Sequence, residues 1–543
     1  MATTDAIERH GWAYLWLGIA AILLWFSTPQ WVIPLAVWLA PVFVLRFMHS
    51  QGIVKGTLML WLVVSLIAGF ANFGFVPLPL VGHLIYTPIA SLVAVLPYIV
   101  ERSIAPRLCG FQQTLVLPLA FTTLDYLQSF FYSGTIVSPA YTQSGNLALS
   151  QLAAVTGVWG ITFLIFWCAA VIHWSWTQQW RWLAVRRSVL SAGLVVGLIV
   201  VLGEARLVLA PSAAPTVRVA AISVDYLNVG QAAYVAKHGK TVHINDDLAA
   251  ASADVLAMQQ ALNEFFVQPD EPRFVSVHDQ LRALYDELFR LSEREARAGA
   301  KIVVWSEANA LVLKADEPGL IARGQALARA QGIYLFMPMV TMTSGTAAFS
   351  AGGNTVENKI IALGPDGRIL ATYFKTKLPI GDASIRGDGS ISVIDTPYGR
   401  IAAVICYDMD TPSYIRQAGQ AGVDIMLAPS GDWQAITPWH ANAAVFRSIE
   451  NGFALVRPVS RGLFVAADQH GQILGTLNFF NTPERVLVVN VPTAHVWTLY
   501  TLIGDSFALL CVAGLVSLVG RIAFHRTRSG FRVGSAELGY QSQ

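Results

Sequence analysis

The sequence predicts an α-helical membrane bundle of about eight spans that carries one α/β sandwich domain outside the lipid. Three observations predict this fold class: the composition, the apolar stretches, and an alternation of strand and helix patterns between residues 215 and 492. Hydrophobic residues make up 54% of the 543 residues and charged residues only 13%. Soluble domains have about 25% charged residues, so part of this chain must lie in lipid.

Eight apolar stretches approach the roughly 20 residues that a helix needs to cross a hydrocarbon core. They lie at residues 12–27, 31–47, 57–75, 82–100, 113–132, 157–176, 188–207 and 497–520. No small-residue cleavage site follows the first stretch, so we expect it to be retained rather than removed as a signal peptide. The expected division is a seven-helix region (1–210), the sandwich domain (215–492), an eighth helix (495–522) and a basic tail (523–543).

Lysine and arginine in the short loops predict the orientation of the bundle. Basic residues occur in every second connection and after the last span: Arg46, Lys55, Arg102, Arg107, Arg181, Arg186, Arg187, Arg521, Arg526, Arg528 and Arg532. The alternate loops, at residues 27–30, 75–80 and 132–156, contain neither residue type. We therefore expect both termini in the cytoplasm and the sandwich domain on the opposite side.

Cysteine usage directs attention to one residue of the domain. Cys168 and Cys511 fall in predicted spans and Cys109 at a cytoplasmic boundary, so the exported domain contains only Cys406. A disulfide within that domain is therefore excluded. A single cysteine in an oxidising compartment is a liability unless it is buried or used, which makes Cys406 a candidate functional residue.

The domain is read as alternating strands and helices, an order typical of an α/β sandwich with outer helices. Strands are predicted at 217–224, 301–305, 334–340, 401–405 and 423–429, a hairpin at 358–375 with its turn at 364–367, and helices at 277–300, 414–421 and 439–451. The stretch 231–273 is polar, alanine-rich and loosely helical, and is treated as an insertion.

Three polar residues stand where predicted strands end: Glu307, Lys375 and Cys406. Ligands of α/β folds bind at strand ends, so the three side chains can converge. Glu307 could then take the thiol proton, Cys406 attack a carbonyl carbon, and Lys375 hold the oxyanion. Each residue alone has a simpler explanation, as a solvated edge, a surface lysine or a buried filler. Their order and spacing favour the shared site.

The motifs around these residues resemble the nitrilase superfamily, and within it the membrane-bound apolipoprotein N-acyltransferase family. The resemblance covers nearly the whole chain. It rests on Val304–Glu307, Tyr373–Pro379 and Val404–Asp408, with weaker matches at Ser138–Tyr141, Gly157–Phe163 and Tyr500–Asp505. It implies a nitrilase-like αββα sandwich in a bacterial inner membrane, with the catalytic domain on the periplasmic side.

The resemblance also implies an activity. Glu307 would be the general base, Lys375 the oxyanion stabiliser and Cys406 the nucleophile. Cys406 would take an acyl chain from a phospholipid as a thioester and pass it to the N-terminal amine of a lipoprotein's diacylglyceryl-cysteine. No cofactor and no metal are implied.

Supporting roles are implied for Asp382, Tyr407 and Asp408, although both aspartates stand where the family usually has glutamates. Trp-Ser-Glu replaces the family's Trp-Pro-Glu, and the segment after Lys375 is shortened. Arg447, Glu450 and Asn451 match the family too, but helix packing is the simpler role for them. The aromatic residues Trp433, Trp439, Phe479 and Phe480 could line a lipid entry, or could be ordinary surface residues.

Other functions remain open at this stage. The same three residues would serve a membrane-tethered amidase or nitrilase that uses water, or an acyltransferase with a different amine acceptor. A transporter or scaffold would explain the spans but not the Glu, Lys, Cys order. Metal catalysis is disfavoured because the eleven histidines are scattered and the nearest pair, His238 and His243, lies in the insertion. The net charge of +2 and the absence of a P-loop give no indication of nucleic acid or nucleotide binding.

Overall fold

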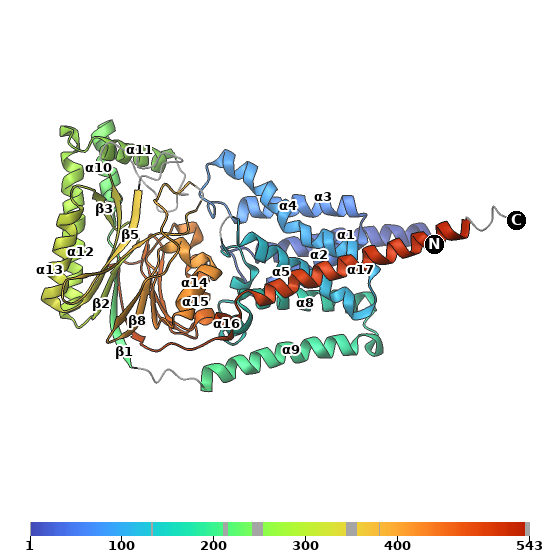
Figure 1. The fold of residues 1–543 in the computed structure, drawn as a ribbon. Coiled ribbons are helices and arrows are strands. Elements are labelled where there is room, and N and C mark those ends of the chain that lie inside the picture. Colours follow the sequence, from blue (N-terminus) through green and yellow to red (C-terminus); the bar gives the residue numbers. More distant parts are fainter. Residues whose placement is uncertain are drawn as a thin grey trace.

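The computed structural model describes residues 2–131, 134–209, 215–241, 253–343, 356–379 and 381–537. Figure 1 shows two parts side by side: a bundle of long helices from the two ends of the chain, and a sandwich of strands and helices from its middle. His243 and part of the predicted insertion lie outside the described residues.

The bundle contains the predicted apolar helices, but not all are long enough to span. Its long helices are α1 (Ala2–Trp25), α2 (Ala36–Ser50), α3 (Ile53–Ala71), α4 (Leu80–Ile104), α5 (Val116–Gln128), α8 (Val158–Thr177), α9 (Trp182–Leu209) and α17 (Ser506–Glu537). Among the described residues, four helical stretches are long and apolar enough to cross a membrane, at 53–71, 80–107, 158–177 and 182–209. A membrane part is thus supported, whereas the predicted number of about eight spans is not confirmed.

Two details of the bundle differ from the prediction. The expected loop at 132–156 contains the short helices η3 (Pro139–Gln143), α6 (Leu147–Ser150) and α7 (Ala153–Thr156). The last span begins later than residue 497, because a short helix α16 (Leu499–Ile503) ends at Gly504, whose φ of 57° breaks the helix before α17 starts.

Two sheets pack face to face in the sandwich. One has the order β15-β1-β2-β4-β5-β6, with β3 paired to β4, and the other has the order β14-β13-β11-β9-β8-β7. The strands of the first sheet are β1 (Thr216–Ile222), β2 (Ile302–Trp305), β3 (Ala310–Leu313), β4 (Tyr334–Met342), β5 (Val356–Leu363), β6 (Ile369–Phe374) and β15 (Val486–Pro492). Those of the second are β7 (Val393–Thr396), β8 (Gly399–Ala403), β9 (Ile425–Leu427), β11 (Ala454–Arg457), β13 (Leu463–Ala467) and β14 (Ile473–Asn478).

The core between the sheets is built from the apolar strand runs that the sequence showed. Val219, Val304 and Phe336 of the first sheet share one buried cluster with Ile401 and Leu427 of the second. Burying such side chains contributes about 1.5–3 kcal/mol each relative to leaving them in water. The strand predictions for β1, β2, β4, β8, β9 and the β5–β6 hairpin are therefore confirmed.

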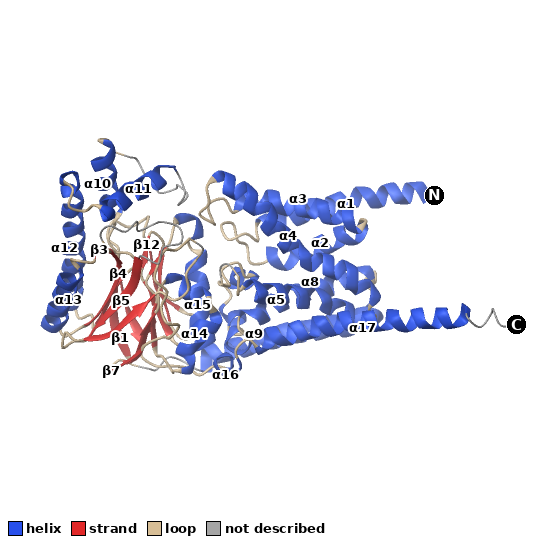
Figure 2. Ribbon diagram, turned by 45° about the horizontal axis from the view of Figure 1, so that its top comes forward, coloured by secondary structure: helices blue, strands red, loops and turns tan. Residues whose placement is uncertain are grey.

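Helices cover both outer faces of the sandwich (Figure 2). The first sheet is covered by α12 (Val275–Arg297) and α13 (Glu317–Gln331), and the second by α14 (Pro412–Gln420) and α15 (Trp439–Asn451). Leu281, Leu284 and Leu288 recur at helical spacing and form the buried stripe of α12. In α15 every residue except Asn442 is buried, because this helix lies between the second sheet and the bundle.

The predicted insertion is an ordered helical layer where it is described. It comprises α10 (Leu227–His238) and α11 (Ala253–Val267), which share a buried cluster with α12. Phe265, Phe266 and Phe274 are fully buried in that cluster. The layer therefore adds its own core to the outer face of the domain.

Replacing Gly452 with alanine is expected to destabilise the junction between α15 and the bundle. Gly452 ends α15 with a φ of 70°, and a Cβ there would lie 1.6 Å from the Val496 carbonyl oxygen. Left-handed backbone alone costs about 1–2 kcal/mol for a residue with a Cβ, and the clash adds to it. The thermal unfolding midpoint of the detergent-solubilised protein should fall by several degrees.

Gly239→Ala is the matched control. Gly239 ends α10 with a φ of 67°, but nothing lies within 4 Å of an added Cβ. Its midpoint should fall less than that of Gly452→Ala. Equal midpoints for the two variants would contradict the steric argument.

Candidate active site

A buried ion pair stands at the strand ends of the first sheet. Glu307 follows β2, and Lys375 follows β6 in the hairpin with β5. The Lys375 Nζ lies 2.9 Å from Glu307 Oε1 and 3.2 Å from Asp382 Oδ2, and the Asn358 side-chain amide also donates to Glu307 Oε1 at 2.9 Å. Glu307 and Lys375 are only 6% and 5% exposed. The two predicted strand-end residues are therefore in direct contact and shielded from water.

Cys406 lies in a tight turn that follows β8. It begins the short helix η5 (Cys406–Asp410) with a φ of 47°, unusual for a residue with a side chain. Its amide donates to the Pro429 carbonyl and its Sγ lies 3.6 Å from the Gly431 carbonyl oxygen. A Cβ added to Gly431 would lie 3.3 Å from Glu307 Oε2. The thiol and the carboxylate therefore flank the same glycine.

Charges link the three side chains. Burial raises the pKa of the Cys406 thiol, the negative charge of Glu307 raises it further, and the Lys375 ammonium opposes both. Burial acts to lower the pKa of Lys375, but the charges of Glu307, Cys406 and Asp382 outweigh it, so the pKa of Lys375 is raised. The Cys406 thiol is thus neutral at rest beside the Glu307–Lys375 ion pair, whose carboxylate can receive the thiol proton.

Asp408 ties the nucleophile turn to the segment after Lys375. Its Oδ1 accepts from the Thr376 and Lys377 amides at 3.1 and 2.6 Å, and its Oδ2 accepts from the Ile405 amide at 2.9 Å and the Tyr373 hydroxyl at 2.6 Å. Asp408 is fully buried. Its carboxylate is thus placed to set the distance between the two segments that carry Lys375 and Cys406.

The other predicted residues are placed as follows. Asp382 contacts Lys375, and Tyr407 lies half-buried in η5 between Cys406 and Asp408. Arg447, Glu450 and Asn451 are fully buried in α15 and not in the pocket. There Glu450 accepts from the Val158 amide of α8 at 3.0 Å, so its contact is with the bundle.

The aromatic residues proposed for a lipid entry have structural contacts. Trp433 and Trp439 donate from their indole N–H groups to the Gly74 and Ile136 carbonyls of the bundle, at 2.7 and 2.5 Å. Trp439 and Phe479 are only 4% and 2% exposed. These side chains join the two parts of the molecule or fill the core.

Asp408→Asn is expected to lower stability by about 2–4 kcal/mol, because one carboxamide oxygen cannot accept from three amides and a hydroxyl, and the new NH₂ group faces two buried donors. Unfolding followed by heat or denaturant measures the loss. Asp388→Asn is the control, since Asp388 also accepts from a nearby amide, that of Ser390, but on the surface. A loss for Asp408→Asn no larger than for the control would contradict this account.

The sequence analysis missed a second buried group of charges beside Cys406. His440 Nδ1 lies 2.7 Å from Asp432 Oδ1, and its Nε2 lies 3.1 Å from Asp410 Oδ2. Arg457 Nη2 donates to Asp432 at 2.8 Å. The group contains one histidine and comes from four separate elements, so a search for closely spaced histidines could not find it. Two aspartates could have indicated the group from the sequence. Asp410 ends the turn that Cys406 begins, and Asp432 follows Gly431, whose carbonyl oxygen contacts the thiol.

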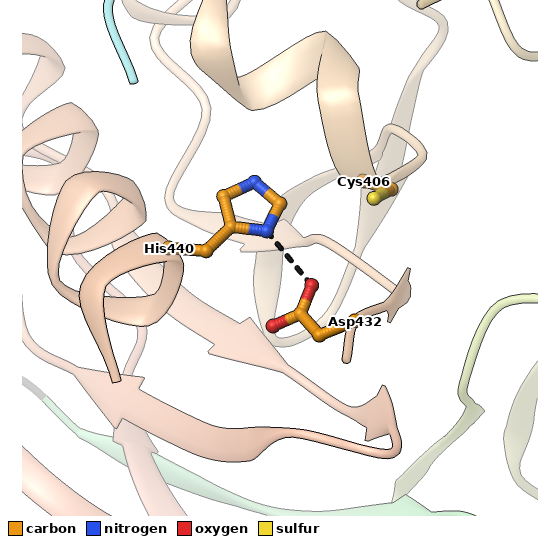
Figure 3. A group of neighbouring side chains, drawn as sticks. All are labelled: Cys406, Asp432 and His440. Carbon is orange, nitrogen blue, oxygen red and sulfur yellow. Dashed lines mark hydrogen bonds and ion pairs between the residues drawn. The ribbon is translucent and has the colours of Figure 1, made fainter. Parts of the chain in front are cut away.

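The atoms of this group raise the question of a metal. The ligand atoms of Cys406, Asp432 and His440 all lie within 4.8 Å of one another (Figure 3). Burial acts to lower the pKa of His440, but Asp410 and Asp432 raise it to about 9. A protonated ring has no lone pair for a cation, and the Arg457 guanidinium lies 2.8 Å from Nδ1. The group fits a charge network better than a metal site.

Comparison with known proteins gives two family matches along the chain. Residues 13–171 match the apolipoprotein N-acyltransferase N-terminal domain, and residues 267–495 match the carbon-nitrogen hydrolase family. An apolipoprotein N-acyltransferase of Geobacter metallireducens is 25% identical over 565 aligned residues, covering 97% of this chain and 98% of its own.

Other relatives match over shorter stretches. The apolipoprotein N-acyltransferase of Brucella melitensis is 27% identical over 36% of this chain and 41% of its own. Apolipoprotein N-acyltransferase 1 of Treponema denticola is 34% identical over 22% of each chain. Among solved structures, an amidase from Nesterenkonia sp. is 19% identical with a TM-score of 0.34, over 39% of this chain and 86% of the amidase.

Proposed function

We propose that this chain, whose bundle matches the apolipoprotein N-acyltransferase N-terminal domain and whose sandwich matches the carbon-nitrogen hydrolase family, is an N-acyltransferase. It would move a fatty acyl chain from a phospholipid, through a Cys406 thioester, to the N-terminal amine of a lipoprotein's diacylglyceryl-cysteine. The two family matches follow one another in the order bundle, then sandwich, which supports this reading over a soluble amidase. The observation that carries the proposal is the buried Glu307–Lys375 pair, whose Glu307 carboxylate lies beside Gly431, the residue that the Cys406 thiol contacts.

In the first half-reaction, Glu307 takes the proton of Cys406 as Sγ attacks the ester carbonyl of the phospholipid. The Lys375 ammonium stabilises the tetrahedral oxyanion. The C–O bond then breaks, and Glu307 returns the proton to the departing alcohol of the lysophospholipid. The acyl chain remains on Cys406 as a thioester.

In the second half-reaction the lipoprotein amine attacks the thioester carbonyl. Glu307 takes a proton from the amine nitrogen, and Lys375 again holds the oxyanion. The C–S bond breaks with the thiolate as leaving group, which regains its proton from Glu307. An amide forms, and the enzyme returns to its starting state.

The helical bundle is proposed to assist the reaction by holding the sandwich domain at the membrane surface. Four long apolar stretches support insertion, and the shorter apolar helices at 12–25, 36–50 and 506–522, together with α5, would complete eight spans. With the basic loops inside, the sandwich would face the periplasm of a bacterial inner membrane. Both substrates are anchored in lipid, so a domain beside the bilayer meets them without drawing a chain into water.

A hydrolase that resolves the thioester with water is the second candidate, since the same side chains would serve it. The family match to the N-terminal membrane domain favours transfer over hydrolysis. A transferase with another amine acceptor differs only in the second half-reaction.

The test uses the full chain, purified in detergent, with a phospholipid that carries a labelled acyl chain. Intact mass should show one acyl adduct, mapped by peptide analysis to Cys406. A lipopeptide with a free N-terminal amine should then remove the adduct and gain the label, whereas the same lipopeptide with an acetylated amine should not. Rapid release of free labelled acid without an amine would favour the hydrolase, and no adduct with any phospholipid would reject the thioester mechanism.

A further inference from the structure

His440 bridges the two segments that hold Cys406. It projects from α15, with its Nδ1 toward Asp432 (Figure 3). Its Nε2 contacts Asp410. Asp410 ends the η5 turn that Cys406 begins, and Asp432 directly follows Gly431, whose carbonyl is the contact of the Cys406 Sγ. The His440 side chain therefore connects the turn that carries the Cys406 thiol to the segment whose Gly431 carbonyl oxygen contacts that thiol.

The turn needs such a connection. Cys406 has a φ of 47°, in a region that costs a residue with a side chain about 1–3 kcal/mol and persists only where its surroundings hold it. Its backbone is held on the other side by Asp408, described above. The Asp410 carbonyl also accepts from the Thr135 amide of the bundle at 2.8 Å. The end of the turn is thus fixed from two directions.

Two carboxylates and one guanidinium surround the His440 ring. Within the part of the chain that the structure describes, the charged groups in contact with the ring are Asp410 from η5, Asp432 after β10 (Ser430–Gly431), and Arg457 from β11. All four side chains are almost fully buried. The titratable Cys406 thiol lies within 4.8 Å of the ligand atom of His440. A neutral ring could donate to only one of the two carboxylates, so only an imidazolium can donate to both at once.

We propose that His440 is a positioning residue which, as an imidazolium, clamps the Cys406 turn to the Gly431–Asp432 segment and so holds the thiol in its reacting orientation. The proposal rests on the proposed function for its effect on acyl transfer. Its effect on the thiol itself can be measured without any lipid substrate. His440 donates no proton to the reaction and touches no substrate.

Two readouts on the full-length His440→Gln variant test the clamp. The first is the alkylation rate of Cys406 by iodoacetamide, in which Sγ displaces iodide and its proton passes to solvent. We expect this rate to change at least about fivefold, since a released thiol no longer keeps its orientation. The second is acyl-adduct formation, for which we expect about a tenfold lower maximal rate with an unchanged half-saturating phospholipid concentration.

The pH profile separates a charged clamp from simple packing. The pKa of His440 is about 6.5 in the unfolded chain. Burial acts to lower it, but the two carboxylates outweigh burial and raise it to about 9 in the folded protein. The clamp is then fully present below about pH 6.5 and is lost as pH rises through about 9. Wild-type adduct formation should fall across that upper limit, and His440→Gln should lack this step.

Controls keep the test decisive. His278→Gln is the control, since His278 lies on α12 with its Nε2 3.0 Å from the Pro269 carbonyl oxygen; this variant should match the wild type in both rates. If His440→Gln does not fold, Asp410→Asn, which weakens one side of the clamp, should give smaller changes of the same kind. Wild-type alkylation, adduct formation and pH profile in the folded variant would overturn the proposal. Micromolar Zn²⁺ inhibition that needs His440 would also overturn it, in favour of a metal site.

Discussion

Replacing Cys406 with alanine is expected to abolish the acyl adduct and to lower acyl transfer by about 10⁴-fold or more, the size of effect seen when a nucleophile is removed from a catalytic triad. Alanine keeps the β-carbon and removes only Sγ, which lies 3.6 Å from the Gly431 carbonyl and makes no strong hydrogen bond. The fold should therefore persist. Intact mass after incubation with labelled phospholipid gives the adduct, and lipopeptide labelling gives the transfer rate.

The remaining cysteines provide the matched controls. Cys109 is exposed and Cys511 is buried in α17, so Cys109→Ala and Cys511→Ala cover both environments away from the pocket. Both variants should retain the adduct and the transfer rate within about twofold. An adduct that survives in Cys406→Ala and disappears in a control would assign the thioester to another cysteine.

Lys375→Met is expected to have the second largest effect, on activity and stability together. Methionine is unbranched like lysine, one atom shorter and uncharged, so Glu307 and Asp382 lose the cation that lies 2.9 and 3.2 Å from them. Breaking a buried ion pair in this way costs about 3–5 kcal/mol. Loss of an oxyanion donor lowers the acylation rate by about 10²–10³-fold.

Unfolding and single-turnover acylation measure the two effects of Lys375→Met. Lowering the pH from about 7 to about 5 should recover part of the stability, because a protonated carboxyl group needs no counter-charge. Lys377→Met is the control, since Lys377 is half-buried two residues away with its Nζ over the Tyr414 ring at 5.3 Å. Similar losses in both variants would mean that the Glu307–Lys375 contact is not what matters.

Some of the fold could be predicted because local patterns decided it. Strands such as β1 and β2 are short apolar runs between polar segments, and their burial in the structure follows that pattern. The strands β11, β13, β14 and β15 were not identified individually; β14 has no buried residue to mark it, and β15 pairs with β1 at the other end of the domain. The start of the last span was placed too early, because the apolar stretch continues across Gly504, where the helix breaks.

The site was predictable only in part for a related reason. Glu307, Lys375 and Cys406 stand at or shortly after strand ends, and the contact between Glu307 and Lys375 follows from that sheet geometry. His440 and Arg457 lie inside a helix and at the end of a strand, and both are almost fully buried. Their pairing with Asp410 and Asp432 depends on how the second sheet packs against α15, which no local pattern encodes.

The burial of α15 on nearly all sides means that the sandwich is not a transferable module. Its Trp439, Phe446 and Ile449 share a core with residues of the bundle such as Tyr141 and Trp159. A fragment cut at residues 215 and 492 would present this apolar strip to water and hydrate the fully buried Arg447–Glu450 pair. Such a fragment should self-associate. A soluble version of the domain for inhibitor screening would therefore need polar substitutions along that strip before the helical bundle is removed.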